Sequence, residues 1–334
     1  MKSYFHYVLC LSEAKGMDIK MIINTGGRTD TVQYYTEWLL NRFSEGYALS
    51  RNPLFPNKVT RYELTPDTVD CVVFCSKNYE PILPRLHEIT DRFHTYFQYT
   101  ITAYGKEIEP GVPGIEESME TLIKLSETVG KQRIAWRYEP VLLTKKYTIK
   151  QHLETFEHMA ETLSPYIDRC IFGFVEIYKK LESNMPELIP MSEQNMDTLA
   201  QGFGAIAERN GILIQTCGSK GDFSRYHIRT SGCITTDMLG DANGIRFRKL
   251  KHKGARQGCH RIENRDIGAY DTCLNGCKYC YANKNPQKAA ENYKFHDRTS
   301  PLLLGAVKPE DTIIRGAQKS FLENKKNTSS VSDK

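Results

Sequence analysis

The sequence has no stretch that approaches the ~20 consecutive apolar residues needed to cross a bilayer. It also lacks a strong charge of one sign. The formal net charge of +5 permits an anionic substrate but does not by itself argue for nucleic acid. With 40% hydrophobic and 10% aromatic residues, the composition is that of a globular protein and excludes a disordered or fibrous one. We therefore expect a folded protein without a membrane partner.

Common signatures of hydrolases and nucleotide-binding enzymes are missing as well. The chain contains neither a G-x-S-x-G motif nor a Walker-type loop. Gly202-Phe203-Gly204 lies inside a helical pattern and lacks the strand–turn–helix context of a dinucleotide fingerprint. His152 and His158 are six residues apart, which does not place them on one helix face, and we expect both at the surface. The chemistry must rest on other residues.

Cysteine is present but is unevenly distributed. Ten cysteines in 334 residues are too few for a disulfide scaffold. Six of them fall within 64 residues: Cys217, Cys233, Cys259, Cys273, Cys277 and Cys280. This crowding indicates a metal or cluster site in a reducing compartment, and we expect a cytoplasmic protein.

Apolar, β-rich runs alternate with helical patterns in the first two thirds of the chain. The predicted strands are Met21–Asn24, Val69–Cys75, Tyr96–Ala103, Arg133–Trp136, Cys170–Ile177 and Ile212–Gln215. The predicted helices are Thr31–Phe43, Pro84–Phe93, Glu116–Val129, Ile149–Leu163 and Ser192–Asn210. Such alternation predicts an α/β fold with a parallel sheet. We expect a partial or open (β/α) barrel of about six β-α units, with a doubly wound open sheet as the alternative.

Changes in composition divide the chain into four parts. Residues 1–20 are expected to be a loosely structured extension, and residues 21–216 a barrel-like domain. Residues 217–322 form a Cys-rich, cluster-binding segment packed on the barrel, and residues 323–334 form a disordered tail. The basic run Arg246–Arg256 is either a solvated loop or a surface for a phosphate-bearing partner.

Polar and ionisable residues accumulate where the predicted strands end. Because catalytic and ligand-binding groups of parallel α/β folds lie at the carboxyl ends of the strands, these residues predict the place of a substrate pocket. They are Asn24, Gly26, Gly27, Arg28, Asp30, Ser76-Lys77-Asn78, Tyr104-Gly105-Lys106, Trp136-Arg137-Tyr138-Glu139, Glu176 and Gln215-Thr216-Cys217.

The segment Cys273-Leu274-Asn275-Gly276-Cys277-Lys278-Tyr279-Cys280 places three thiols at C-x-x-x-C-x-x-C spacing. This spacing brings three sulfurs to one centre, and Asn275-Gly276 supplies the backbone freedom that the loop needs. Three thiolates can hold three corners of a 4Fe–4S cluster and leave the fourth iron open. The alternative is a structural zinc ion, with Cys259-His260 completing a site around Cys277 and Cys280.

This motif, with Tyr279 before its last cysteine, resembles the signature of radical S-adenosylmethionine (SAM) enzymes. The resemblance implies that Cys273, Cys277 and Cys280 hold a 4Fe–4S cluster and that Tyr279 packs near the cluster or the adenine of SAM. It also implies that SAM is cleaved reductively to a 5′-deoxyadenosyl radical, which abstracts hydrogen from a substrate. A one-electron reductant such as flavodoxin or ferredoxin would then be a partner.

Four further segments carry a second resemblance: Gly27-Arg28-Thr29-Asp30, Arg51-Asn52-Pro53, Trp136-Arg137-Tyr138-Glu139-Pro140 and Asp266-Ile267-Gly268-Ala269-Tyr270. With them the chain resembles the bacterial domain-of-unknown-function family 1848 (DUF1848) from Met21 to Leu322. The cysteine loop is similar to that of spore photoproduct lyase and related proteins. Two features differ from most radical SAM enzymes: the loop follows the last predicted strand, and no Gly-Gly-Glu run follows it. Gly26 and Gly27, with Arg28, are the cofactor-binding candidates instead.

The other clustered cysteines, Cys217, Cys233 and Cys259, either hold a second iron–sulfur cluster or are free buried thiols. Cys71 and Cys75 lie four apart on a predicted strand, where core packing is the better interpretation.

Two functions of different classes follow. The first is a radical SAM enzyme in which Arg137 and Glu139 contact the unknown substrate or SAM, with Glu176 and Lys77 as secondary candidates. The second is a nucleic-acid-binding or DNA-lesion-repair protein that an iron–sulfur cluster or zinc ion stabilises. It would bind nucleic acid through Arg246–Arg256.

Overall fold

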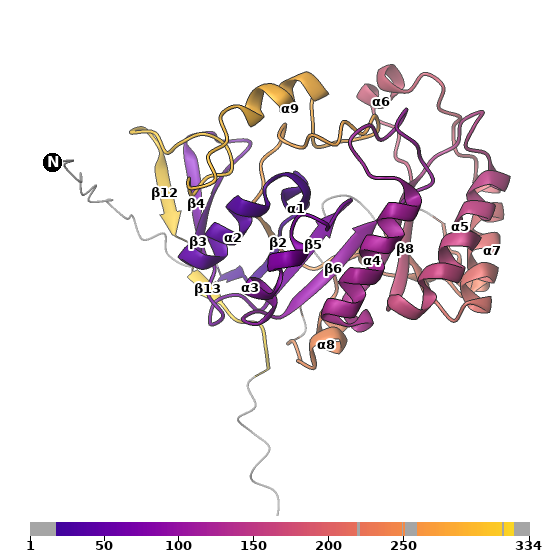
Figure 1. Cartoon of the computed structure of the whole chain (residues 1–334), viewed down its shortest axis with the longest axis horizontal. Helices are drawn as coiled ribbons and strands as arrows, with labels where there is room; N and C mark the ends of the chain where they lie inside the picture. The colour runs from indigo at the N-terminus through magenta and orange to yellow at the C-terminus, as the bar shows by residue number, and fades with distance from the viewer. Residues whose placement is uncertain (1–17, 219–220, 249, 251–258, 316, 324–334) are drawn as a thin grey trace, which may run out of the picture.

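The computed structural model describes residues 18–218, 221–248, 250, 259–315 and 317–323, and its centre is an eight-stranded parallel sheet (Figure 1). The strands are β2 (Ile22–Asn24), β5 (Cys71–Ser76), β6 (Thr95–Thr100), β7 (Ile134–Val141), β8 (Arg169–Phe174), β9 (Leu213–Thr216), β10 (Arg229–Thr230) and β11 (Arg265–Asp266). Each of the six predicted strands overlaps a strand of this sheet, which confirms the predicted α/β class.

Helices connect the strands. They are α1 (Thr31–Tyr34), α2 (Thr36–Glu45), α3 (His87–Thr90), α4 (Ile115–Val129), α5 (Ile149–Leu163), α6 (Lys179–Asn184), α7 (Glu193–Arg209), α8 (Thr236–Asn243) and α9 (Pro286–Tyr293). The predicted α5 agrees with the structure residue for residue, and Thr148 caps it by accepting a hydrogen bond from the backbone N–H of Gln151. Gly211, just after α7, has φ +64°, the left-handed conformation in which many helices end.

The predicted helix Thr31–Phe43 is interrupted at Tyr35 and becomes α1 and α2. The Tyr35 hydroxyl donates a hydrogen bond to the Thr272 carbonyl at 2.6 Å, and its ring meets the ring of His296 edge-on. Both partners come from the C-terminal part of the chain, so no local pattern in the sequence could indicate the interruption.

The order of strands across the sheet is β10-β9-β8-β7-β6-β5-β2-β11. From β2 to β9, neighbouring strands follow one another in chain order across the sheet. A doubly wound sheet needs a point at which this strand order reverses. The doubly wound alternative is therefore wrong. Beyond the two edge strands, the backbone N–H of Ile262 donates to the carbonyl of Ile234 at 2.9 Å, so the segments that extend β10 and precede β11 are in contact.

Aromatic side chains fill one face of the sheet. Trp136 and Tyr138 of β7 pack on Phe156 of α5, and Phe156 packs on Phe203 of α7. All four side chains are at most 1% exposed. Because burying an aromatic side chain removes 150–250 Å² from water, roughly, this cluster fixes α5 and α7 on the sheet.

The opposite face of the sheet packs against the C-terminal part of the chain. Its residues alternate along each strand with those that meet the helices. From the strands come Ile22, Cys71, Val73, Tyr96, Ala135 and Ile171, with Cys217 just after β9; from the C-terminal part come Cys233, Ile234, Met238, Leu239, Ala242 and Ile262. These contacts cover the opposite face of the sheet with residues from the C-terminal part of the chain.

A second, three-stranded sheet of order β12-β4-β3 lies to one side (left in Figure 1) and has no counterpart in the prediction. β3 (Tyr47–Arg51) and β4 (Lys58–Glu63) form an antiparallel hairpin, and β12 (Thr312–Arg315) pairs with β4. β1 (Asp18–Lys20), inside the predicted extension, pairs with β13 (Ala317–Lys319). Residues 1–17 and 324–334 of the predicted extension and tail lie outside the described residues.

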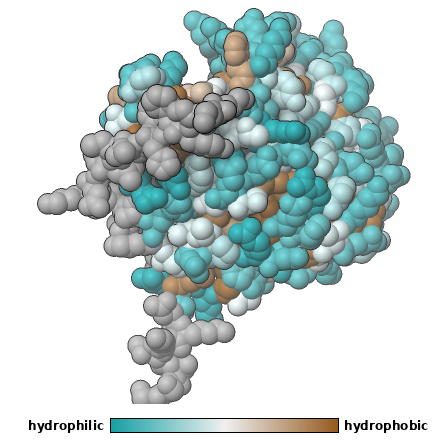
Figure 2. All heavy atoms as spheres, turned by 60° about the vertical axis from the view of Figure 1, so that its left-hand side comes forward, coloured by the Kyte–Doolittle hydropathy of each residue, from teal (hydrophilic) through white to brown (hydrophobic). Residues whose placement is uncertain are grey.

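The surface seen from the side of this second sheet is mainly hydrophilic, with apolar residues scattered among polar ones (Figure 2). Within the described residues, no helix combines the length and the apolar character that a membrane span requires.

The expected surface position of His152 is wrong, whereas His158 is exposed and pairs with Glu116. His152 is 0% exposed, and its Nε2 donates to the Leu142 carbonyl at 2.8 Å. Its Nδ1 then accepts from the Tyr138 hydroxyl at 2.8 Å. Burial lowers the pKa of His152 to about 4, against the opposing effect of the Leu142 hydrogen bond.

This buried histidine predicts a pH dependence of stability. Because the unfolded chain binds a proton near pH 6.5 and the native chain only near pH 4, stability is lost as the pH falls through this window. The slope should reach about 1.4 kcal/mol per pH unit. His152→Gln keeps a donor and an acceptor but cannot titrate, so urea unfolding between pH 7 and 4.5 should show a shallower loss. Equal slopes in both proteins would contradict this assignment.

Candidate functional site

The cysteine loop, Cys273–Cys280, lies at the carboxyl edge of the eight-stranded sheet. It follows β11, which runs parallel to β2 with Asp266 beside Asn24. The Asp266 carboxylate accepts backbone hydrogen bonds from Gly27 at 2.7 Å and from Gly268 at 2.8 Å. Burial raises the pKa of Asp266, although these N–H groups oppose the rise. The carboxylate thus ties the end of the first strand to the segment that leads into the loop.

Asn275 anchors the middle of the cysteine loop. Its Oδ1 accepts from the Tyr34 hydroxyl at 3.0 Å, its Nδ2 donates to Asp30 at 3.3 Å, and its carbonyl accepts from the N–H of Gly111 at 2.8 Å. Gly276 has φ +65°, a left-handed conformation that glycine adopts without strain. The predicted backbone freedom is confirmed at Gly276, whereas Asn275 acts through its hydrogen bonds.

A buried carboxylate, Glu109, lies beneath Tyr279. One of its oxygens accepts hydrogen bonds from Lys77 Nζ and from the Thr102 hydroxyl, both at 2.9 Å, and also from the Tyr279 hydroxyl. The Glu109 side chain is 2% exposed and that of Lys77 13%. This network fixes the Tyr279 ring, whose predicted place near a cofactor stays a prediction.

The other side of the cysteine loop is held by α6. Lys180 Nζ donates to the carbonyl of Cys280 at 2.7 Å, and the Asn184 amide donates to the carbonyl of Lys278 at 3.1 Å. Glu176, a secondary candidate, precedes α6 and is exposed. Hydrogen bonds therefore hold the loop on both sides, from Tyr34 and Asp30 on one side and from α6 on the other.

The three thiols of the loop are close enough to influence one another electrostatically. Burial raises the pKa of Cys273 to about 12, and a negative charge on Cys280 adds to the rise. Burial also raises the pKa of Cys277 well above its usual value, where Lys77 opposes and the other two thiols reinforce the rise. One of these three adjacent thiols is buried and two are half-buried, so they need a positive centre to ionise together, and iron supplies one. The donor set therefore fits a thiolate-ligated cluster.

The structure brings together the second predicted group, Cys217, Cys233 and Cys259. The thiol of Cys217 shares hydrogen bonds with both other thiols. The bond with Cys217 lowers the pKa of Cys233, as does the charge of Arg137, whereas the same bond raises the pKa of Cys217. In this group, too, three thiols lie close together, and the pKa of one of them, Cys233, is lowered.

Two inner-face glutamines position this second group. Gln98 donates to the carbonyl of Cys233, and Gln215 donates to the carbonyl of Gly232 at 2.9 Å. A Cβ atom on Gly232 would lie 2.5 Å from the carbonyl oxygen of His260. The segments that carry Cys233 and Cys259 therefore pass in direct backbone contact, which only glycine at 232 allows.

Arg137 and Glu139 lie beside the second cysteine group. Both point to the inner face of β7, and their side chains are 19% and 15% exposed. Arg137 donates from Nη1 to the Cys75 sulfur at 2.9 Å and from Nη2 to Glu139. Burial alone would lower the pKa of Arg137, but the charges of Glu139, Cys75 and Cys233 raise it. The core-packing interpretation therefore holds for the fully buried Cys71 but not for Cys75.

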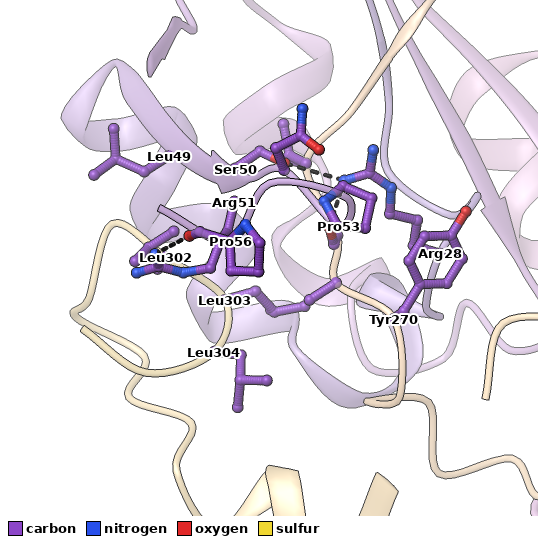
Figure 3. Close-up of a pocket in the computed structure, with 14 residues that line it drawn as sticks. Arg28, Leu49, Ser50, Arg51, Pro53, Pro56, Tyr270, Leu302, Leu303 and Leu304 are labelled. Atoms are coloured by element: carbon purple, nitrogen blue, oxygen red, sulfur yellow. Dashed lines mark hydrogen bonds between the residues drawn. The ribbon is translucent and has the colours of Figure 1, made fainter. Parts of the chain in front are cut away.

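The three cofactor-binding candidates at the end of β2 have different surroundings: Gly26 and Gly27 are tightly packed, whereas Arg28 lines a pocket. A Cβ atom on Gly26 would lie 1.9 Å from the Cys75 carbonyl oxygen, and one on Gly27 would lie 2.4 Å from Asp266 Oδ2. Both glycines thus have a packing role, whatever they bind. The Arg28 side chain lines a separate pocket with Tyr270 (Figure 3). A SAM contact for any of the three stays a prediction.

The alternative zinc site finds no support in this arrangement. Cys259 hydrogen-bonds with Cys217, a residue outside the proposed zinc set. In the described part of the chain, no three His, Cys, Asp or Glu side chains are placed to hold one metal ion. The three loop thiols are no exception, so the choice of a cluster over zinc rests on the cysteine spacing.

Most of the basic run Arg246–Arg256 lies outside the described residues. Arg248 lies within them, and it donates hydrogen bonds to the carbonyls of Ser320 at 3.0 Å and Leu322 at 3.4 Å. Its guanidinium therefore holds the C-terminal segment against the fold.

Two functional candidates, Cys75 and Glu109, were missed by the sequence analysis. Cys75 alternates with Cys71 on one strand face, which is also what core packing produces, and its meeting with Arg137 depends on strand order. Glu109 lies in a loop with no motif around it. No signal in a single sequence could have found it.

Comparison with known proteins adds the family. A family model, Domain of unknown function (DUF1848), matches residues 22–282, which is more than half of the chain. The chain belongs to the DUF1848 family. No curated protein and no solved structure matches it. The region matched to DUF1848 begins at β2 and ends just after Cys280, so it contains both cysteine groups and the Arg137–Glu139 pair.

Gly26→Ala tests the close approach of Gly26 to the backbone of Cys75. The added methyl group must displace the Cys75 backbone, so the free energy of unfolding should fall by about 1–3 kcal/mol. Gly114→Ala is the matched control, because its Cβ would meet nothing within 4 Å, and its cost should stay below about 1 kcal/mol. Urea unfolding measures both, and equal losses would contradict the close approach.

Proposed function

We propose that this DUF1848 protein is a radical SAM enzyme. The observation that carries the proposal is the convergence of the Cys273, Cys277 and Cys280 thiols at the carboxyl edge of a parallel sheet. The chemistry of parallel α/β folds lies at this edge. The three thiolates would hold a 4Fe–4S cluster.

The place of β11 in the sheet supports the comparison with radical SAM enzymes. Although the cysteine loop follows the last predicted strand in sequence, β11 lies beside β2 at the start of the spatial strand order. The loop therefore follows the spatially first strand, in the position expected of a permuted barrel.

We also propose that the sheet closes partly into a barrel. The unidirectional strand order supports this, as does the Ile262–Ile234 hydrogen bond between the segments that flank the two edge strands. The inner face would then be the interior, with Arg137, Glu139 and both cysteine groups at its carboxyl end.

When bound, the cluster and SAM supply reductive cleavage to a 5′-deoxyadenosyl radical and hydrogen abstraction from the substrate. The chain's own residues hold and orient the reactants. Arg137 offers a guanidinium already aligned by Glu139 and Cys75, suited to a carboxylate or phosphate. The buried Lys77–Glu109 pair fixes Tyr279 and places a positive charge near Cys277.

Replacing one loop thiol should abolish this activity. After anaerobic reconstitution with iron and sulfide and reduction with dithionite, Cys277→Ala should release no more 5′-deoxyadenosine from SAM than cluster-free protein. Cys170→Ala is the control, because Cys170 is a buried thiol on the helix-facing side of β8. Liquid chromatography of the products measures both. Undiminished 5′-deoxyadenosine formation by Cys277→Ala would refute the proposal.

We propose that Cys217, Cys233 and Cys259 hold a second cluster. Their mutual hydrogen bonds and the adjacent Arg137 charge support it. Reconstituted protein should then contain about eight irons per chain, and Cys259→Ala about four. Iron and protein assays on the same samples, with Cys170→Ala unchanged, test this. Four irons in both wild type and Cys259→Ala would mean that these thiols are free.

A further inference from the structure

A pocket of about 280 Å³ opens beside the cysteine loop and has no part in the proposed cluster chemistry (Figure 3). Four parts of the chain form it: Arg28 after β2, residues 49–53 and Pro56 of the β3–β4 hairpin, residues 267–270 after β11, and residues 302–304. Leu49 joins two of these walls, because its N–H donates to the Pro301 carbonyl at 2.9 Å. No cysteine lines the pocket.

Two arginines line the pocket, and they differ in their partners: Arg51 is paired with a carboxylate, whereas the hydrogen-bond acceptors of Arg28 are neutral. Arg51 forms a two-pronged ion pair with Asp311, with N–O distances of 2.5 and 2.7 Å, so its charge is neutralised. Arg28 forms no ion pair at salt-bridge distance with any described residue. Its Nη1 donates to the Ser50 hydroxyl at 3.2 Å and to the Gly268 carbonyl at 3.4 Å, both neutral acceptors. Burial raises the pKa of the Asp266 carboxyl and the Arg28 charge lowers it, but the guanidinium has no direct ionic partner among the described residues and presents its remaining donors to the pocket.

Several N–H groups of the Arg28 guanidinium form no hydrogen bond with the described residues. It has five N–H groups, and both of its hydrogen bonds within the described residues come from Nη1. The group also lies 5.5 Å from the centre of the half-exposed Tyr270 ring, which limits its orientations. A fixed, half-buried guanidinium with free donors suits an anion of planar or tetrahedral geometry.

The opposite side of the pocket is apolar apart from the ion-paired Arg51. Figure 3 shows Arg28 and Tyr270 at one side and Leu49, Leu302 and Leu304 at the other, with Pro53 and Pro56 along the hairpin. A ligand that fills the pocket would meet a cation at one end and aliphatic carbon at the other.

We propose that this pocket binds a small amphiphilic anion, with its carboxylate or phosphate on Arg28 and its aliphatic part against the leucines. A small site of this kind combines a mostly apolar lining with a few polar groups that fix the ligand's orientation. The inference goes beyond the radical SAM proposal and does not depend on it, since the pocket walls contain no cluster thiol.

Calorimetric titration of the full-length protein with octanoate and octyl phosphate tests the proposal, with octanol and octylamine as uncharged and cationic counterparts. At least one of the two anions should bind, and should bind at least about tenfold more tightly than either counterpart. The preferred anion identifies the headgroup as carboxylate or phosphate. Arg28→Gln should weaken this binding by about tenfold or more, and Arg28→Lys by less. Arg209→Gln, at an exposed arginine paired with Glu157, should leave it unchanged.

Leu304→Glu provides a second variant at the apolar end, in case Arg28→Gln fails to fold. A carboxylate there should repel both anions, and circular dichroism shows whether the variant is folded. Anion binding no tighter than that of octanol, or unchanged in both folded variants, would overturn the proposal. Displacement of the bound anion by SAM would also overturn it, because the pocket would then be part of the SAM site.

Discussion

The pairing of β11 with β2, secured by the Asp266 carboxylate, is the constraint on which the site depends. Two N–H groups, from Gly27 and Gly268, meet one carboxylate and hold together segments 239 residues apart in the chain. Such charge-assisted bonds are roughly twice as strong as neutral ones, and their partial burial makes them costly to leave unmade. This pairing places the segment that leads into the cysteine loop beside the end of β2, and the hydrogen bonds of Asn275 and Lys180 then hold the loop in place.

The charges around the loop are balanced locally. Lys77 pairs with Glu109, Arg137 with Glu139, and Arg137 also meets the Cys75 sulfur. These partly buried pairs contribute little net stability, because desolvation offsets much of their attraction. Their effect is to hold polar groups in defined positions beside the two groups of thiols. The thiols themselves lack a positive centre of sufficient charge, which a bound cluster would provide.

Strand and helix periodicity predicted the six central β-α units, because these are local and strongly apolar. The β3–β4 hairpin escaped prediction because its strands are only half-buried and its partner β12 lies some 250 residues further along the chain. The cysteine motif predicted the loop, but not that β11 would bring it beside the first strand. Likewise, the contact of Cys75 with Arg137 and the burial of Glu109 depend on strand order, which a single sequence does not reveal.

Electron paramagnetic resonance of the reconstituted, dithionite-reduced protein, recorded with and without SAM, tests the central claim most directly. It reports on the cluster and on its open coordination position together. We predict a reduced 4Fe–4S signal that is absent from Cys273→Ala and that changes shape when SAM is added. Absence of any cluster signal, or a signal that SAM leaves unchanged, would contradict the assignment of Cys273, Cys277 and Cys280 as the ligands of a SAM-binding cluster.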